Sequence, residues 1–187
     1  MEQQFIREIL EGNPSGFSYF VTTYKHMAYT IAYRILRNRE DAEEIVQDSF
    51  IKAFNALRTF RKESKFSTWF FRIVVNTALT HRRNVLHEEQ NSKEYEDTSE
   101  QIDSLENAHK NLARTDREKY IRLALDHLGP EDGLLLTLFY LNENTLEEIN
   151  EITGTKVPNL KMKLLRARKK MFSVLHALLQ SETYSLL

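Results

Sequence analysis

The sequence predicts an all-α protein with two small helical domains joined by an acidic linker. Only five of its 187 residues are glycine and three are proline, whereas sheet-rich folds need many tight turns. Over residues 41–57 the small and apolar side chains recur at intervals of three and four residues, which is the period of an amphipathic helix. Charged side chains are also segregated along the chain, although the net charge is only −1.

Two basic blocks flank an acidic one. Between residues 52 and 83, Glu63 is the only acidic residue. Between residues 88 and 106 the pattern inverts, and Lys93 is the only Lys or Arg. Between residues 156 and 170 every charge is positive. This order favours two polyanion-binding modules separated by a linker, but charge runs are also typical of solvated faces, so charge alone leaves nucleic-acid binding open.

Four helices are expected in the N-terminal half, over residues 1–84. Asn13 or Ser15 is expected to cap the second helix and Asp41 the third. The fourth helix is expected to start at Ser67 or Thr68, after a basic loop. The expected helical ranges are 2–12, 15–37, 41–57 and 67–83, with the loop over 58–65.

The segment 85–114 has the composition of a linker, because it is acidic and poor in aromatic residues. It contains apolar residues around Ile102 and Leu105 where helical turns are expected. We place the domain boundary in this segment and the second domain over residues 115–187.

The C-terminal half predicts a helix-turn-helix. Thr145 and Glu148 form a capping-box pattern that opens a short helix to about Thr153. A turn at Gly154 follows, and Pro158 lies near the first turn of a long basic helix. The expected helical ranges are 115–128, 131–140, 145–153 and 158–179.

No catalytic or metal-binding pattern occurs in the sequence. It lacks a Gly-rich phosphate loop, His-Glu-x-x-His and Gly-x-Ser-x-Gly, and its six histidines are scattered. Without cysteine there is no disulfide scaffold or thiolate metal site. The acidic N-terminus is unlike a signal peptide, and no apolar run approaches the roughly 20 residues of a membrane span. We therefore expect no enzyme activity, no cofactor and no stable membrane insertion, and we expect a cytoplasmic location.

The last helix has the pattern of a DNA-binding helix. Leu160, Leu164 and Ala167 fall on one face and are expected to pack against the preceding helices. Cations on the other faces can neutralise phosphates, while Arg166 can reach a guanine and Leu165 a thymine methyl in a major groove. A basic, solvated C-terminal helix is the alternative.

The first basic block interleaves cations with aromatic residues. Single-stranded nucleic acid is bound by cations along its backbone and by aromatic rings that stack on its bases. A polar loop at 61–64, beside Asn76 on the following helix, therefore suggests a pocket for an unstacked base. The alternative places Trp69 and its phenylalanine neighbours in the hydrophobic core.

Four segments resemble the extracytoplasmic-function (ECF) RNA polymerase sigma factors of the sigma-70 family. Region 2 of that family is similar to residues 35–53, which include DAEEIVQ, and to residues 60–76, which include FSTW. Region 4 is similar to 146–149 (LEEI) and 160–168 (LKMKLLRAR). The resemblance covers about 10–83 and 117–175, in the order of the family.

The resemblance implies a bacterial subunit that binds core RNA polymerase through the β′ clamp helices and the β flap. It implies single-stranded binding of the −10 promoter element, duplex binding of the −35 element and restraint by an anti-sigma factor. The acidic linker would run toward the RNA exit path. The residues implied are Glu44, Gln47, Asp48 and Ile51 for core polymerase; Phe60, Arg61, Ser64, Lys65, Trp69, Arg72 and Asn76 for the −10 strand; and Lys156, Asn159, Lys161, Met162, Lys163, Leu165, Arg166 and Lys169 for the −35 duplex.

The sequence departs from the family pattern at two places. Asn150 stands where the family usually has alanine, and residues 159–163 read NLKMK where it usually has TVKSR. The second change replaces a bidentate arginine fork with a lysine point charge. Two other hypotheses remain: a helix-turn-helix regulator that works without polymerase, and a degenerate sigma factor that acts as a decoy. An enzyme is the least supported reading.

Overall fold

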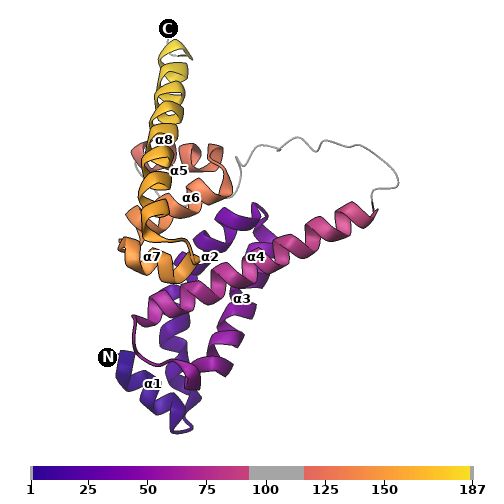
Figure 1. Cartoon of the computed structure of the whole chain (residues 1–187), viewed down its shortest axis with the longest axis vertical. Coiled ribbons are helices and arrows are strands. Elements are labelled where there is room, and N and C mark those ends of the chain that lie inside the picture. The colour runs from indigo at the N-terminus through magenta and orange to yellow at the C-terminus, as the bar shows by residue number, and fades with distance from the viewer. Residues whose placement is uncertain (1, 93–115, 186–187) are drawn as a thin grey trace.

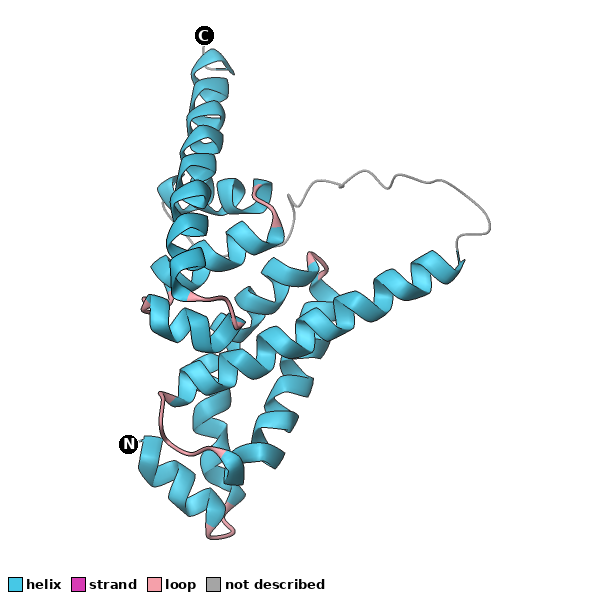
Figure 2. Ribbon diagram, viewed as in Figure 1, coloured by secondary structure: helices cyan, strands magenta, loops and turns pink. Residues whose placement is uncertain are grey.

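The structure, a computed structural model, describes residues 2–92 and 116–185 (Figure 1). Within these ranges the secondary structure is helical, with short connecting turns and no strand (Figure 2). None of the described helices combines the length and apolar character that a bilayer crossing requires. The all-α prediction is confirmed.

The N-terminal half is a bundle in which α2, α3 and α4 pack on one another. Helix α1 and two short 3-10 turns close one end of it. The bounds are α1 Glu2–Leu10, η1 Pro14–Gly16, α2 Phe17–Leu36, α3 Arg39–Ala56, η2 Leu57–Thr59 and α4 Phe66–Ser92.

The start of α3 differs from the prediction. Asn38, not Asp41, is the N-cap, and its side chain accepts a hydrogen bond from the Asp41 backbone N–H at 3.1 Å. Asn38 has the extended backbone (φ −119°, ψ 136°) that an N-cap needs. Glu40 and Asp41 therefore lie in the first turn, where the helix dipole favours carboxylates.

Phenylalanine rings fill the centre of this bundle. Phe20, Phe70 and Phe71 are fully buried, and Phe66 and Phe50 are nearly so. The ring of Phe70 stacks on Phe50 at 4.5 Å between centroids, and Phe20 lies 4.2 Å from Phe66. Helices α2, α3 and α4 each contribute to this cluster, so it fixes how α4 sits on the other two.

The C-terminal half contains the predicted helix-turn-helix, preceded by helices α5 and α6. The helix expected over 131–140 is interrupted: α-helical geometry ends at Leu136, and a π-helical turn follows in which Asn142 N–H donates to the Thr137 carbonyl. The bounds are α5 Asp116–His127, α6 Pro130–Leu136, η3 Thr137–Leu141, α7 Leu146–Thr153 and α8 Val157–Ser185.

Helix α4 runs beyond the boundary expected at residue 84. The segment that follows residue 84 is polar but has neither glycine nor proline, so nothing in it ends the helix before Ser92. Helix α8 likewise continues past Leu179 to Ser185. The turns expected around Ile102 and Leu105 lie outside the described residues.

The two halves pack against each other. Helix α7 lies against α4, and α6 lies against α2 (Figure 1). A single hydrophobic cluster of buried residues includes side chains from both halves. The helix-turn-helix therefore stands directly beside the loop that precedes α4.

We predict that Phe70→Ala destabilises the protein by about 3–5 kcal/mol, because it removes a fully buried ring and leaves a cavity. The loss is measured by urea unfolding followed by circular dichroism. Phe172→Ala, at a residue 71 % exposed, is the matched control and is expected to change stability by less than about 0.5 kcal/mol. Equal losses in the two variants would contradict this account of the core.

Candidate nucleic-acid interface

One face of α4 carries four of the residues expected to contact single-stranded DNA. Lys65, Trp69, Arg72 and Asn76 follow one another at intervals of four, three and four residues, so they form one stripe along the helix. Lys65, Arg72 and Asn76 are exposed and Trp69 is half-buried. The stripe begins just before the first residue of α4 and runs along the side that the bundle core leaves free.

Trp69 belongs both to this stripe and to the edge of the core. Its ring lies 5.2 Å from that of Phe60 and 5.5 Å from that of Phe66, and Phe66 is only 2 % exposed. The two alternatives for Trp69, a base-stacking residue and a core residue, therefore both apply. Packing fixes the indole and leaves part of it accessible. Such a ring can serve as a stacking platform for a base.

The basic loop lines a cavity of about 550 Å³. Phe60, Ser64 and Lys65 contribute to its walls, as does α1. Across the cavity stand Glu148 and Glu151 of α7. Neither carboxylate was expected beside this loop from the sequence, since both lie more than eighty positions away along the chain. Arg61 is exposed and is not among the lining residues.

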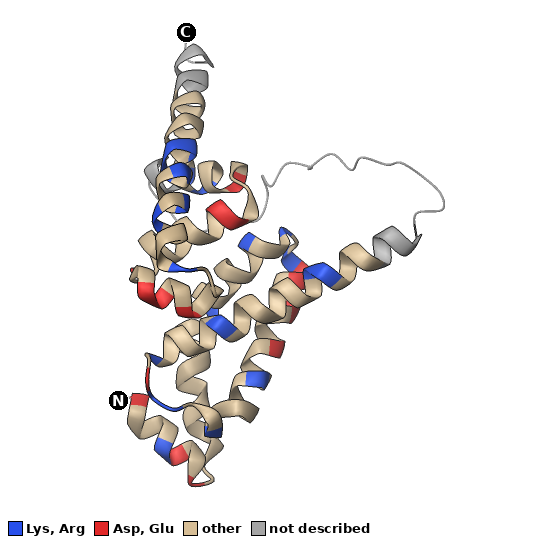
Figure 3. Ribbon diagram, in the orientation of Figure 1, with Lys and Arg blue, Asp and Glu red and all other residues tan. Residues whose placement is uncertain are grey.

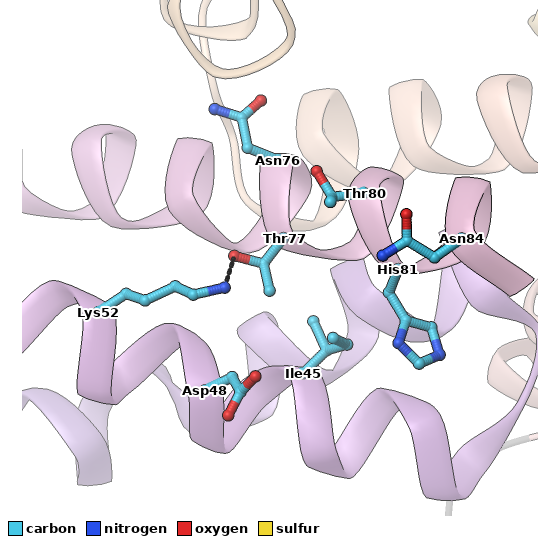
Figure 4. Close-up of a pocket in the computed structure, with 8 residues that line it drawn as sticks. All are labelled: Ile45, Asp48, Lys52, Asn76, Thr77, Thr80, His81 and Asn84. Atoms are coloured by element: carbon cyan, nitrogen blue, oxygen red, sulfur yellow. Dashed lines mark hydrogen bonds between the residues drawn. The ribbon is translucent and has the colours of Figure 1, made fainter.

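Asn76 lies at a different cavity, of about 320 Å³, between α3 and α4 (Figure 4). Lys52 reaches across from α3 and donates a hydrogen bond to Thr77 Oγ1 at 3.3 Å. Asn76 therefore does not share a pocket with Ser64 and Lys65, as the sequence suggested. The other residues that line this cavity are Ile45, Asp48, Thr80, His81 and Asn84.

The face of α3 expected to bind polymerase is solvent-accessible. Glu44, Gln47 and Ile51 are exposed, Asp48 is half-buried, and their spacing places them on one side of the helix. Ile51 is 60 % exposed, so its aliphatic side chain is available for contact with a partner. Phe54, Leu79 and Leu86 are also exposed apolar residues of α3 and α4.

The first helix of the helix-turn-helix, α7, is capped at both of its ends. Thr145 and Glu148 form the predicted capping box, with Thr145 Oγ1 accepting from Glu148 N–H at 3.1 Å and Glu148 Oε2 accepting from Thr145 N–H at 2.9 Å. Gly154 ends α7 with a left-handed φ of 72°, which favours glycine.

Asn150 has a defined role in that turn. Its half-buried side-chain amide donates a hydrogen bond to the Thr155 carbonyl at 2.9 Å, across the turn between α7 and α8. The polar residue thus satisfies a backbone acceptor where the family usually has alanine. It braces the turn and does not loosen it.

The outer face of α8 is basic and exposed. Leu160, Leu164 and Ala167 are buried against the preceding helices, as predicted. Lysine and arginine gather along this part of α8, whereas α7 carries glutamates (Figure 3). Of the residues expected to contact the −35 duplex, those exposed are Lys156, Asn159, Lys161, Met162, Leu165, Arg166 and Lys169.

Two lysines of α8 are engaged with α6 instead. Lys163 Nζ lies 2.8 Å from Glu131 Oε2, so this half-buried member of the expected DNA set has an internal partner. Lys170 Nζ lies 2.5 Å from Asp132 Oδ2. These exposed pairs add little to the packing of the buried apolar face of α8, and they leave the outer cations available to phosphates.

No cluster of three or more His, Asp or Glu side chains able to hold a metal ion occurs within residues 2–92 and 116–185. The surfaces described above carry cationic, aromatic and amide groups beside α4 and on α8, and carboxylates on α3. Their chemistry suits nucleic acid and a protein partner.

Comparison with known proteins matches each half of the chain to a family model. Residues 20–85 match the family model of Sigma-70 region 2, and residues 118–171 match that of Sigma-70, region 4. The RNA polymerase sigma-H factor of Pseudomonas aeruginosa is 28 % identical over 96 % of both chains. The ECF RNA polymerase sigma factor SigW of Bacillus subtilis is 27 % identical over 91 % of this chain and 95 % of its own.

Solved structures share the fold. The sigma factor RpoE of Bartonella quintana, crystallised with the anti-sigma factor NepR, superposes with a TM-score of 0.67 at 21 % identity, over 86 % of this chain and 96 % of its own. CnrH in complex with the cytosolic domain of CnrY gives a TM-score of 0.63 at 20 % identity, over 92 % and 96 %. With both region models matched in order along the chain, this protein belongs to the sigma-70 family, as a sigma factor of the ECF kind.

Proposed function

We propose a division of labour within this sigma factor, which binds core RNA polymerase and directs promoter-specific transcription initiation. Residues 1–84 bind core polymerase and the unpaired −10 element, residues 115–187 bind the −35 duplex, and residues 85–114 link them. The protein acts by binding and not by catalysis, and it works in the cytoplasm, where bacterial DNA is transcribed. The single observation that carries the proposal is the exposed cationic and aromatic stripe on α4.

The stripe suits a single strand better than a duplex. Arg72 and Lys65 are spaced to follow a phosphate backbone, and Trp69 lies between them with part of its ring exposed. Asn76 completes the stripe with an amide, which can donate to and accept from a base edge. A lone strand can lay its bases on such a surface, whereas paired bases in a duplex keep their faces stacked.

The outer face of α8 suits a duplex. An α-helix fits the major groove of B-DNA, and Met162, Leu165, Arg166 and Lys169 recur at spacings that keep them together on one side. Lys169 contributes phosphate neutralisation, while Arg166 and Leu165 can read base edges. We propose that Lys163 contributes less, because Glu131 already neutralises it.

The α3 face suits a basic protein surface. Glu44 and Asp48 supply carboxylates and Ile51 supplies an exposed apolar side chain. We propose that these residues and Gln47 dock on the β′ clamp helices and that the second domain meets the β flap. A helix-turn-helix regulator without polymerase leaves this face without a role, so we do not favour it.

We predict that Glu44→Lys combined with Asp48→Lys abolishes capture of core polymerase, because the basic partner surface then meets two cations. Pull-down with purified core enzyme measures the loss. Glu8→Lys combined with Glu11→Lys makes the same change of charge on and just after α1 and is expected to leave capture unchanged. If the α3 variant still captures core polymerase as the control does, this face is not the docking surface.

We predict that Arg72→Ala weakens binding of the holoenzyme to single-stranded −10 oligonucleotides and flattens its salt dependence. Loss of one phosphate contact lowers the slope of log K against log salt by about 0.7. Fluorescence anisotropy across a salt series measures this slope. Arg82→Ala removes an exposed arginine from another side of α4 and is the control. An unchanged slope in Arg72→Ala would remove this residue from the DNA path.

A further inference from the structure

Helix α8 is rolled on its domain so that Met162 points away from the core. Leu160, Leu164 and Ala167 are the residues that α8 buries against the preceding helices. Because an α-helix turns by about 100° per residue, Met162 lies about 140–160° around the axis from each of these three. Its side chain is 53 % exposed and belongs to the second turn of α8. Met162 therefore occupies the centre of the outer face, the part of the helix that would enter a groove deepest.

Leu165 extends this apolar centre by one turn. It is 48 % exposed. It lies about 60° around the axis from Met162 and about 4.5 Å further along it. Lys161 and Arg166, both exposed, flank the pair on opposite sides, and the exposed Lys169 follows one turn later. The outer face of the first turns of α8 is thus apolar at its centre and cationic at its edges.

The lysine that follows Met162 does not alter this arrangement. Lys163 Nζ lies 2.8 Å from Glu131 Oε2, on the side of α8 that faces α6. Its charge is therefore directed away from the surface on which Met162 stands. A base edge that met the centre of the outer face would meet a thioether and an aliphatic side chain, with the cations placed to reach the phosphates beside it.

A methionine in this place favours one chemical feature of the major groove. The methyl group presented there is the C5-methyl of thymine, whereas the other groups that distinguish the bases are hydrogen-bond donors or acceptors. A polar base edge covered by Met162 would lose its water and gain no partner, which costs affinity. A thymine methyl covered by Met162 removes apolar surface from water on both molecules, which adds affinity.

We propose that Met162 is a specificity-determining residue, and that the duplex read by α8 carries two neighbouring A·T pairs whose thymine methyls pack against Met162 and Leu165. The rise of about 4.5 Å between the two residues is close to the spacing of about 3.4 Å between successive base pairs. Methionine is unbranched and flexible, so it reaches a methyl on either strand and accepts A·T or T·A at its position. The inference rests on the proposed binding of the −35 duplex by α8.

Replacing single thymines with deoxyuridine tests the proposal, because the change removes only the C5-methyl group and keeps the base pairing. The probe is a fluorescent promoter fragment located by genome-wide mapping of this protein with polymerase. The holoenzyme, reconstituted from core polymerase and the full chain, is titrated against it by fluorescence anisotropy at one salt concentration. Deoxyuridine at each of two neighbouring pairs of the −35 element is expected to weaken binding roughly fourfold, the effect of burying one methyl group. Deoxyuridine in the spacer is expected to change nothing.

Met162→Ala identifies which of the two contacts belongs to this residue. It shortens an exposed side chain, so the fold is expected to stay unchanged, as circular dichroism can verify. The variant is expected to bind thymine and deoxyuridine equally at one pair and to keep the fourfold difference at the other. Leu165→Ala is expected to give the reciprocal result. Leu141→Ala, at an exposed leucine of the same domain outside α8, is the control and is expected to keep both differences.

Selection from fragments with a randomised −35 window gives a second, independent measurement. The wild-type holoenzyme is expected to enrich A·T pairs at two neighbouring positions. Met162→Ser, which introduces the residue that the family usually has there, is expected to lose the enrichment at one of them. Enrichment of G·C pairs at these positions by the wild type would contradict the proposal.

The outcomes also separate this inference from the proposed function. If deoxyuridine weakens binding nowhere in the −35 element, or if both differences survive in Met162→Ala, the proposal is overturned. A fragment with a scrambled −35 element then decides how far the failure extends. Affinity that is lost on scrambling leaves the −35 assignment of α8 in place and removes only the methyl readout. Affinity that is unchanged on scrambling overturns both.

Discussion

The position of α4 is the constraint on which the rest of the structure depends. One side of the helix inserts Phe66, Phe70 and Phe71 among the rings of α2 and α3. A neighbouring side lies against α7 of the other domain. The remaining side bears the exposed residues Arg72 and Asn76. Because a helix repeats about every 3.6 residues, one segment presents these three surfaces at fixed angles to one another. The aromatic core thus sets the direction in which the stripe of Lys65, Trp69, Arg72 and Asn76 points.

Much of the fold could be predicted because its signals are local. The spacing of apolar residues locates the helices, and Thr145 with Glu148 forms a capping box that the sequence displays openly. Local signals also mislead: Asp41 resembles a cap, yet Asn38 is three residues earlier and takes the extended backbone. The end of α4 was missed because linker-like composition does not prevent a helix that lacks glycine and proline from continuing.

The contacts between the domains left no signal in the sequence. Arg34 and Asp126 are 92 positions apart, and neither stands out among its neighbours. The sequence indicates that Glu148 takes part in the capping box, but it gives no indication that Glu148 also pairs with Lys65. The same limitation explains why the expected DNA pocket is divided, since the pattern places Asn76 and Ser64 near each other while the fold opens separate cavities beside them.

The charge of this protein has to be considered separately for each domain and each face. A net charge of −1 alone gives no attraction to a polyanion such as nucleic acid. The outer face of α8 and the loop before α4 are nevertheless cationic, while α7 and the exposed face of α3 carry carboxylates (Figure 3). The first pair of surfaces suits DNA, and the second suits basic partners, including the protein's own loop.

The central claim is that the α4 stripe holds unpaired promoter DNA, and photo-crosslinking tests it most directly. Iododeoxyuridine is placed at single thymine positions of the −10 element in a promoter located by genome-wide mapping of this protein with polymerase. After irradiation of the open complex, mass spectrometry identifies the attached peptide. The account predicts attachment within residues 60–76, with Trp69 as the main site. Attachment confined to α8, or to core polymerase alone, would contradict it.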